Sequence, residues 1–464
     1  MRPLLSLTSL LVLAACAVGP DYVEPLPPSS AQGDFVSLGD AVTTDAPRGD
    51  WWRLYDDPVL DGFVTQALEE NTDIRVALAN VARARAGLRR AGSDAGPELE
   101  AGLGGNYGRS IAPDGGLTSE DWQFQASAGV SYEIDLFGRV SRGVEAARGD
   151  LAAAEADAQA VRILVAAETT RAYADFVAAR EQLAVAERIV ALLDESLSLT
   201  QRRREVGLAT RFDTARLATL RDQRSAEVPL FAARRDAALF SLAALTGNTP
   251  AGFPASAIPR HESLALDTTV PVGDGAALLA RRPDVRAAER RLAAATARVG
   301  VVTADLFPRI SLGASAASVG GDLGDVLTGG PIGWLLGGLL DWAINPGRAE
   351  AEIAIANAEA DGLLAEFDGA VLRALQETDT ALSAYGHSLE RQAALGSALE
   401  EARAALRIAQ VRQREGDIGL LELLDAQRTF ADTEADYSGA RADVASAQID
   451  LFLALGGGWG DRPA

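Results

Sequence analysis

The sequence is poor in the residues that most often carry chemistry. Its 464 residues contain one cysteine, Cys16, and two histidines, His261 and His387. It therefore has no disulfide framework, no cysteine–histidine metal site and no thiol chemistry. The Gly-x-Ser-x-Gly motif, the P-loop and a helix-opening Gly-x-Gly-x-x-Gly motif are also missing. We expect no catalytic residue, no metal, no cofactor and no enzymatic activity.

Long apolar runs and basic charge are scarce as well. After residue 15 no apolar run reaches about eighteen residues, so the rest of the chain has no transmembrane helix. Without residues 1–15 the chain has 42 basic and 65 acidic residues and a net charge of −23. Phosphate binding needs a basic surface, so we expect no nucleic-acid partner. The chain is either soluble or crosses a membrane without a helix.

The N-terminus has the features of an export signal. Arg2 precedes the apolar run "LLSLTSLLVLAA", which is too short to span a bilayer and predicts a signal peptide over residues 1–15. The Leu-Ala-Ala-Cys order that ends at Cys16 resembles the bacterial lipobox, which implies lipid attachment to this cysteine, with palmitate among the acyl chains. Ala17 follows in place of aspartate, which by the same resemblance implies the outer membrane. The alternative is an ordinary signal peptide with an incidental cysteine.

The sequence contains an internal duplication. Shifted by 211 positions, Pro97 overlays Pro308 within a longer match, and shifted by 209 positions, Gly207 overlays Gly416. A shared bias toward Ala and Arg does not align isolated Pro and Gly residues. We therefore predict two repeats with flanking segments: a lipidated N-terminal and equatorial segment at 16–58, the first repeat at 59–247, an equatorial linker at 248–273, the second repeat at 274–457 and a C-terminal tail at 458–464.

Each repeat has the same predicted order: a helix, a β-hairpin, a very long helix and a shorter helix. The stretch at 144–206 has no proline and one glycine, and at 1.5 Å per residue it predicts about 95 Å of helix. Two adjacent apolar stripes on it favour a wall or cylinder of helices. The expected ranges are 59–91, 99–134, 144–206 and 212–245 in the first repeat, and 274–305, 310–344, 348–415 and 420–455 in the second.

The predicted hairpins alternate apolar side chains with polar or small ones, as half-buried strands do. The four alternating segments are 99–108, 122–134, 310–318 and 332–344, with Gly/Asp-rich loops at 109–121 and 319–331. Trp122, Trp334 and Trp342 are candidates for membrane-interface aromatics. A soluble sheet with one buried face is the alternative. If the strands span a membrane, several chains must combine, because single-chain barrels start at about eight strands and open edges in lipid are costly.

Several segments in a fixed order carry a family resemblance: "CAVGPDYVEP" at 16–25, "WWRLYDDPVLDGFVTQALEENTDIRVA" at 51–77, "YEIDLFGRV" at 132–140, "LFPRISLGAS" at 306–315, "LLDAQR" at 423–428 and "LALGGGW" at 453–459. Together they resemble the outer membrane efflux proteins, the TolC/OprM-like family, and within it the NodT-type lipoproteins of RND efflux systems. The resemblance implies an α+β membrane protein. In that fold a homotrimer closes a 12-stranded outer-membrane β-barrel, four strands per chain, which a long periplasmic α-helical barrel continues.

The resemblance also implies partners and a function. The partners are outer-membrane lipid, a periplasmic adaptor and an inner-membrane RND-type pump. The chain would be the exit duct for small molecules, opened when adaptor and pump dock. A duct for type I protein secretion is an alternative within the same class, and a periplasmic coiled-coil lipoprotein is an alternative of another class. The acidic composition favours a cation-preferring lumen.

Two sets of site residues follow from the resemblance. The adaptor-docking tips are the turns at Val206, Gly207, Leu208 and Thr210, and at Gly416, Asp417, Ile418 and Gly419; by sequence alone these are only turns. The periplasmic gate is Leu421, Asp425 and Arg428, which share one helical face because they lie four and three residues apart. The alternative for Asp425 and Arg428 is a solvated charge pair. The first repeat has Phe212, Arg216 and Thr219 at the corresponding positions.

Overall fold

The computed structural model describes residues 17–31, 33–46, 49–109, 120–253, 256, 258–260, 262–266, 268–328 and 331–457. The predicted signal peptide, Cys16 and the predicted C-terminal tail therefore lie outside the described residues. The chain divides into two compact units. Unit 1 comprises residues 1–26, 79–155 and 286–368, and unit 2 comprises residues 27–78, 156–285 and 369–464.

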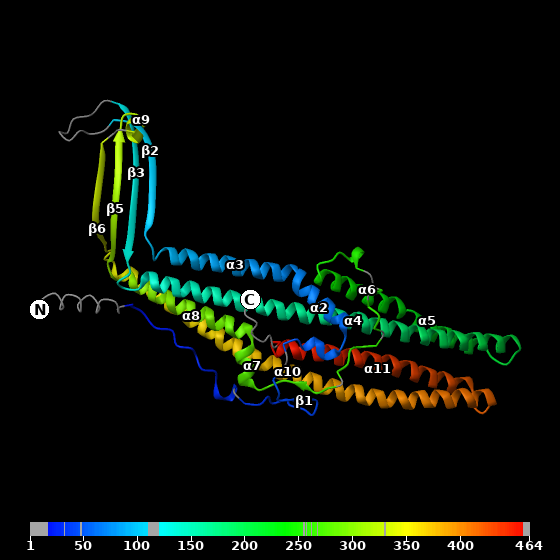
Figure 1. The fold of residues 1–464 in the computed structure, drawn as a ribbon. Coiled ribbons are helices and arrows are strands. Elements are labelled where there is room, and N and C mark those ends of the chain that lie inside the picture. Colours follow the sequence, from blue (N-terminus) through cyan, green and yellow to red (C-terminus); the bar gives the residue numbers. More distant parts are fainter. Residues whose placement is uncertain are drawn as a thin grey trace. The chain divides into compact units, whose positions relative to one another are not determined.

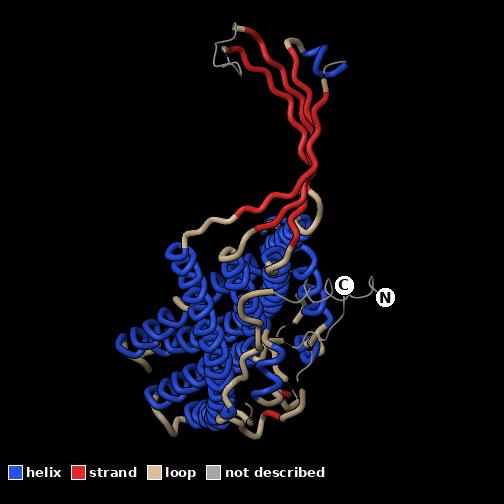
Figure 2. The backbone as a smooth tube through the Cα atoms, turned by 90° about the vertical axis from the view of Figure 1, so that its left-hand side faces the viewer, coloured by secondary structure: helices blue, strands red, loops and turns tan. Residues whose placement is uncertain are grey.

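Unit 1 contains a four-stranded sheet in which every neighbouring pair is antiparallel. The order of the strands is β2-β3-β5-β6 (Figure 1), and β2 and β6 are the edges; Figure 2 shows the strands in red. The strands are β2 (Glu98–Gly108), β3 (Asp121–Ile134), β5 (Arg309–Gly320) and β6 (Ile332–Asp341). The predicted second hairpin extended to residue 344, whereas β6 ends at Asp341, so Trp342 lies just beyond the strand.

The register of the sheet aligns the apolar side chains of each strand with those of its neighbours. Trp122 is opposite Tyr107, while Ala316 is opposite both Ala128 and Trp334. Side chains alternate between the faces of a strand, so these residues share one face and the polar residues at 123, 125 and 127 share the other. Within a single chain the apolar face is uncovered, since Trp334 is 79% exposed. A sheet with an exposed apolar face and two open edges needs lipid or further chains to cover it.

Two helices are unusually long. α4 (Arg139–Glu205) has 67 residues and α10 (Pro346–Glu415) has 70, which corresponds to about 100 Å each. Both begin earlier than predicted. The Asp135 carboxylate accepts hydrogen bonds from the first backbone amides of α4, at 3.1 Å from Val140 N and 2.7 Å from Ser141 N. A proline is at the first position of α10, where the helix needs no N–H donor.

Three of the four shorter segments predicted as single helices are interrupted. The segment predicted at 59–91 forms α2 (Pro58–Glu70) and α3 (Thr72–Ser93), because Asn71 is extended and its side chain accepts hydrogen bonds from Asp73 N and Ile74 N. The segment predicted at 212–245 forms α5 (Arg211–Ser225) and α6 (Val228–Leu245), and Pro229 lies in the first turn of α6. The segment predicted at 274–305 forms α7 (Gly275–Arg281) and α8 (Pro283–Ala304). Proline excludes a continuous helix at the last two breaks.

Two further elements complete the comparison with the prediction. α11 (Leu420–Ala454) is continuous, close to its predicted range. The second Gly/Asp-rich linker, predicted as a loop, contains the short helix α9 (Leu323–Thr328), which the Asp322 carboxylate caps by accepting from Asp325 N at 2.9 Å. The prediction missed it because Gly and Asp are unfavourable inside a helix but favourable at its start.

Unit 2 holds the main hydrophobic core. Trp51 is 1% exposed and stacks on Phe452 with 4.7 Å between ring centroids, and Tyr173 and Leu242 are fully buried beside them. The elements among the described residues of the predicted equatorial segments are short: η2 (Ser29–Ala31), β1 (Val42–Thr43), η3 (Trp51–Tyr55), η4 (Pro250–Gly252) and β4 (Val270–Pro271), with β1 and β4 paired in parallel. Among the described residues, no helix is both long and apolar enough to span a membrane.

Candidate functional site

The turn between α4 and α5 forms the first hairpin tip. Gly207 has a φ of 79°, and its amide donates to Arg204 O at 3.0 Å while the Leu208 amide donates to Arg203 O at 2.8 Å. A glycine favours this left-handed helix end because it has no Cβ to clash. Thr210 and Asp213 then start α5 with a reciprocal capping box. The hydroxyl of Thr210 donates to Asp213 and so lowers the pKa of that carboxyl.

The turn between α10 and α11 forms the second hairpin tip and repeats the same helix end. Gly416 has a φ of 84°, its amide donates to Gln413 O at 3.3 Å, and the Asp417 amide donates to Arg412 O at 2.8 Å. The start of the next helix differs, because Gly419 takes the place of Thr210 and offers no side chain to cap α11. The two tips therefore share their backbone turn and differ in their caps.

The side chains of the two tips also differ in exposure. In the first tip Val206, Leu208 and Phe212 are 70%, 75% and 67% exposed. In the second tip Ile418 is half-buried and packs beside Leu406 and Leu423. The first tip thus presents apolar side chains to the surroundings, which is typical of a surface that binds another protein.

The three predicted gate residues lie on one face of α11. Leu421 is 55% exposed, and Asp425 and Arg428 are exposed beside it. The adjoining face is buried: Leu424 packs in a cluster with Leu193 and Leu217, and Gln427 Nε2 donates to Ser196 Oγ at 2.7 Å. α11 is therefore anchored through one face, which leaves the gate residues free to meet another chain or the solvent.

Arg428 does not pair with Asp425. Its Nε lies 3.6 Å from the carboxylate of Asp432, one turn further along α11, and Arg224 binds the same carboxylate. The charge pair considered from the sequence as an alternative is therefore absent, and Asp425 is left as an exposed acid. In the first repeat, the guanidinium of Arg216 lies 5.5 Å from the ring centroid of Phe212. A cation–π pair therefore occupies the positions that correspond to Leu421 and Asp425.

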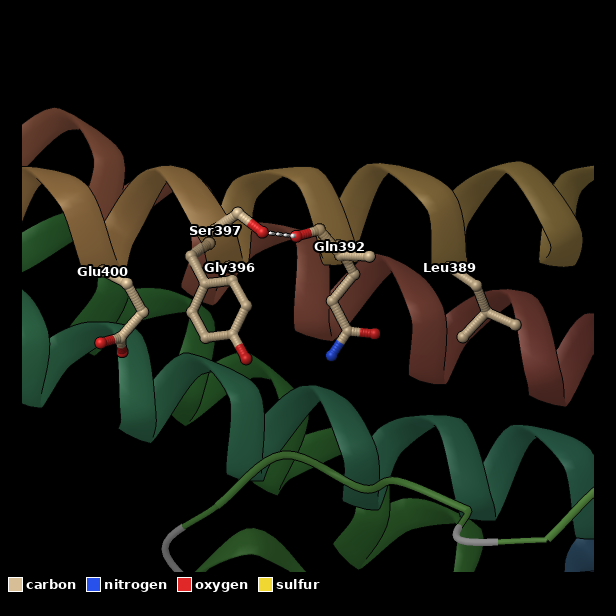
Figure 3. A pocket seen from close by; sticks show the side chains of 7 residues that line it. Leu389, Gln392, Gly396, Ser397 and Glu400 are labelled. Carbon is tan, nitrogen blue, oxygen red and sulfur yellow. Dashed lines mark hydrogen bonds between the residues drawn. The ribbon is translucent and has the colours of Figure 1, made fainter.

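Unit 2 has a shallow groove of about 520 Å³ between α10 and α11, whose lining side chains Figure 3 shows. The Tyr437 ring lies 3.3 Å from the point where a Cβ on Gly396 would be, so the absence of a side chain lets the ring approach α10. The lining residues are Leu389, Gln392, Ala393, Gly396, Ser397, Glu400 and Tyr437. Across the described part of the chain, no group of three or more His, Cys, Asp or Glu residues could hold a metal ion.

A sequence profile described as "Outer membrane efflux protein" matches residues 63–248 and 276–457, one match in each half of the chain. The chain belongs to the outer membrane efflux protein family. This confirms the predicted family, and the two matched blocks correspond closely to the two predicted repeats.

Individual members of the family are similar over nearly the whole chain. The outer membrane protein OprJ of Pseudomonas aeruginosa is 31% identical over 470 positions that cover 99% of this chain and 97% of that protein. The toluene efflux pump outer membrane protein TtgC of Pseudomonas putida is also 31% identical, covering 99% of this chain and 96% of that protein. These similarities support the predicted location in the outer membrane.

Solved structures of outer-membrane channels show the same fold. The outer-membrane channel OprN matches with a TM-score of 0.88 and 33% identity, covering 96% of this chain and 100% of that chain. The open state of the MtrE outer membrane channel of Neisseria gonorrhoeae matches with a TM-score of 0.82 and 27% identity, covering 96% and 98%. This efflux protein therefore has the predicted channel fold, in which a β-barrel continues into long helices.

Aromatic side chains of this efflux protein lie near both ends of its sheet. At one end Trp122 is 5.6 Å from Tyr107, measured between ring centroids. At the other end Trp342 donates its indole N–H to Leu306 O at 3.1 Å, and Phe137 stacks on Phe307 at 4.5 Å. The sequence analysis named the tryptophans but missed the phenylalanine stack, because its two members are 170 positions apart and flank different strands. Two aromatic levels are typical of a membrane-spanning sheet.

Proposed function

We propose that this chain is the outer-membrane exit duct of a tripartite efflux system for small molecules. The observation that carries the proposal is the open four-stranded sheet, apolar on one face and mainly polar or glycine on the other, in a chain that also has two helices of about 100 Å. Three copies would close twelve antiparallel strands into a barrel with no free edge, which lipid requires. The helices of the three copies would continue the barrel as a tunnel through the periplasm.

The hairpin tips are the proposed contact with a periplasmic adaptor, which would couple the duct to an RND-type pump in the inner membrane. Support comes from the exposed apolar side chains Val206, Leu208 and Phe212 of the first tip. The second tip would add Gly416, Asp417, Ile418 and Gly419. Since apolar residues at the centre of an interface contribute most of the binding free energy, we expect the first tip to provide the stronger adaptor contact.

Leu421, Asp425 and Arg428 are the proposed periplasmic gate. All three are exposed on one face of α11, and around a threefold axis each would form a ring of three. Three like charges close together repel one another unless they bind a cation or a partner group. A ring of Asp425 carboxylates would therefore disfavour anions and support a cation preference in the closed duct.

Cys16 is the proposed site of lipid attachment. It would carry acyl chains into the periplasmic leaflet of the outer membrane, and two or more chains suffice for stable anchoring. The barrel would hold the protein in the same membrane independently. The proposed exported solutes are small molecules of the kinds named for the relatives, several of which are toluene, solvent or antibiotic efflux components.

Single-channel recording in planar bilayers tests the proposal. We expect purified trimers to give small, rare openings, and Asp425→Ala to raise conductance or open probability by up to about tenfold, the effect of about 1.4 kcal/mol on the opening equilibrium. Arg216→Ala, at the corresponding position of the first repeat, is the matched control and should leave conductance near the parent value. Absence of SDS-resistant trimers, or no conductance in the parent and in Asp425→Ala, would contradict the proposal.

A further inference from the structure

The chain that directly follows Cys16 lies in a narrow groove of unit 1. We call residues 17–22 the N-terminal clasp. The Val18 amide donates to Phe137 O at 3.1 Å. Gly19 has a φ of 93°, and a Cβ built on it would lie 2.5 Å from the Cα of Gly300 in α8. Any side chain at Gly19 would therefore both strain the backbone and overlap the helix.

Two charged side chains of the groove hold the clasp. Arg142 of α4, whose side chain is only 9% exposed, donates to Asp21 at 2.5 Å and to Glu145 at 2.8 Å. The hydroxyl of Tyr22 donates to the carboxylate of Glu289, which is 6% exposed in α8. Burial and this hydrogen bond raise the pKa of Tyr22 well above its ordinary value, so it remains a donor. Buried charges need such partners, because an unpaired one is costly.

Three of the residues that hold the clasp are not repeated at the corresponding positions of the duplication. By the 211-residue offset Gly300 corresponds to Arg89 and Glu289 to Leu78, and by the 209-residue offset Arg142 corresponds to Ala351. None of the three replacements could make the contact described above. The fourth residue, Gly138, does have a counterpart, Gly347, by the 209-residue offset. Arg142, Glu289 and Gly300 therefore contact the clasp but have no equivalents at the duplicated positions.

The clasp begins at the junction between the strands and the helices. A Cβ on Gly138 would lie 2.8 Å from the Cβ of Ala17, and Gly138 lies between the last residue of β3, Ile134, and the first residue of α4. The stacked rings of Phe137 and Phe307 lie at the same junction. Ala17, the residue that follows Cys16 in the sequence, therefore lies at the level of this junction.

We propose that the groove formed by Gly138, Arg142, Glu289 and Gly300 is a docking site for the clasp, and that it sets the depth at which the acyl chains of Cys16 enter the membrane. This inference rests on the proposed lipid attachment to Cys16. The acyl chains would leave the protein beside the junction aromatics and lie against the apolar face of the sheet. The lipid is then a fixed part of the strand–helix junction and not a loose tether.

The lone cysteine makes a direct test possible. Export of the chain behind an ordinary signal peptide leaves Cys16 unacylated and open to labelling with an environment-sensitive bimane. Trimers in phosphatidylethanolamine and phosphatidylglycerol vesicles that contain brominated lipid should show strong quenching of this label. Arg142→Ala and Gly300→Val should lose most of the quenching. Arg142→Ala removes the partner of Asp21, and Gly300→Val adds a side chain whose Cβ would lie 2.9 Å from Cγ of Arg142, which displaces the guanidinium that binds the clasp.

Two matched variants control for general effects on the helices. Arg348→Ala removes an exposed arginine that pairs with Glu352 on its own helix, and Gly87→Val adds a side chain where nothing lies within 4 Å. Both should keep the quenching of the parent. If Gly300→Val fails to assemble, the double change Asp21→Ala and Tyr22→Phe alters only the clasp and should lose the quenching in the same way.

Three outcomes would overturn the inference: a parent label that bromolipid does not quench, full quenching in Arg142→Ala and Gly300→Val, or equal losses in the two control variants. The proposed function has a separate readout. Incorporation of labelled palmitate into the native chain reports lipid attachment, and bilayer conductance reports the duct. Normal conductance and normal palmitate incorporation, together with a parent label that bromolipid does not quench, would overturn the docking inference and leave the proposed function intact.

Discussion

In each repeat of this efflux protein a side chain donates a hydrogen bond to a carbonyl at a helix end, but the side chain differs between the repeats. In the first repeat Asn71 Nδ2 donates to Leu245 O at 3.1 Å, and in the second Arg282 Nη1 donates to Ala454 O at 2.9 Å. Asn71 and Arg282 correspond by the 211-residue offset, and the two carbonyls correspond by the 209-residue offset. A carbonyl at a helix end needs a donor, so the donor is kept while its identity changes.

The change of side chain has a consequence for charge. Arg282 also binds the carboxylates of Asp284 at 2.8 Å and Glu377 at 2.7 Å, whereas neutral Asn71 only caps the next helix. The first repeat keeps an acid, Glu168, at the position that corresponds to Glu377. Duplicated backbones therefore tolerate different electrostatics when the backbone donors and acceptors remain satisfied.

Removing the two side chains should affect the repeats unequally. Arg282→Ala leaves two carboxylates without their cationic partner and leaves the Ala454 carbonyl with only the Thr378 hydroxyl as donor, at 3.3 Å. It should lower the free energy of unfolding by about 3 kcal/mol. Asn71→Ala removes a helix cap and one hydrogen bond to a carbonyl and should cost about 1–2 kcal/mol. Urea unfolding in detergent, followed by far-UV circular dichroism, measures both. Equal losses would show that the charges around Arg282 contribute nothing.

The same comparison predicts a pH effect at Asp284, the carboxylate that Arg282 binds in the second repeat. Burial raises the pKa of Asp284, but the hydrogen bond and ion pair with Arg282 lower it below its ordinary value overall. Its stabilising contribution is therefore present above the unfolded pKa of about 3.9 and is lost as the pH falls through the folded value. Because the side chain is 44% exposed, we expect only about 1 kcal/mol.

Urea unfolding at neutral pH and near pH 3 checks this prediction. The parent should lose stability on acidification, and Arg282→Ala should lose less because the partner of Asp284 is already gone. An identical acid loss in the two proteins would assign the pH dependence to other carboxylates.

The smallest effect concerns the caps of the two hairpin tips. Thr210→Gly removes the capping box of α5, and Gly419→Thr supplies the missing cap of α11, where Glu422 already occupies the third position. Each change should shift local stability by a few tenths of a kcal/mol, in opposite directions. Amide hydrogen exchange in the first turns of the two helices measures the shift. No change at α11 would mean that the Glu422 carboxylate prevents the introduced hydroxyl from reaching the backbone amide of Glu422.

Much of the architecture follows from local patterns in the sequence. The strands at 122–134 and 310–318 alternate strictly, and both long helices lack internal proline, so their type and approximate range could be predicted. The breaks at Asn71, Pro229 and Pro283 were missed because the helical periodicity continues on both sides of each. The gate residues could be placed on one face of α11, but the partner of Arg428 could not, since Asp425 and Asp432 are both within reach along a helix.

The sequence by itself predicted the export signal and the duplication. It determined the alternating strands, the long helices and the glycines that end them, because each of these elements depends on residues that are neighbours in the chain. Only the tertiary structure decided which distant residues meet. Gly19 approaches Gly300, and Arg142 binds Asp21, over separations that no local period encodes. The docking of the N-terminal clasp follows from the close approach of backbones at those glycines and from the need of buried charges for a partner, and both are properties of the packed structure.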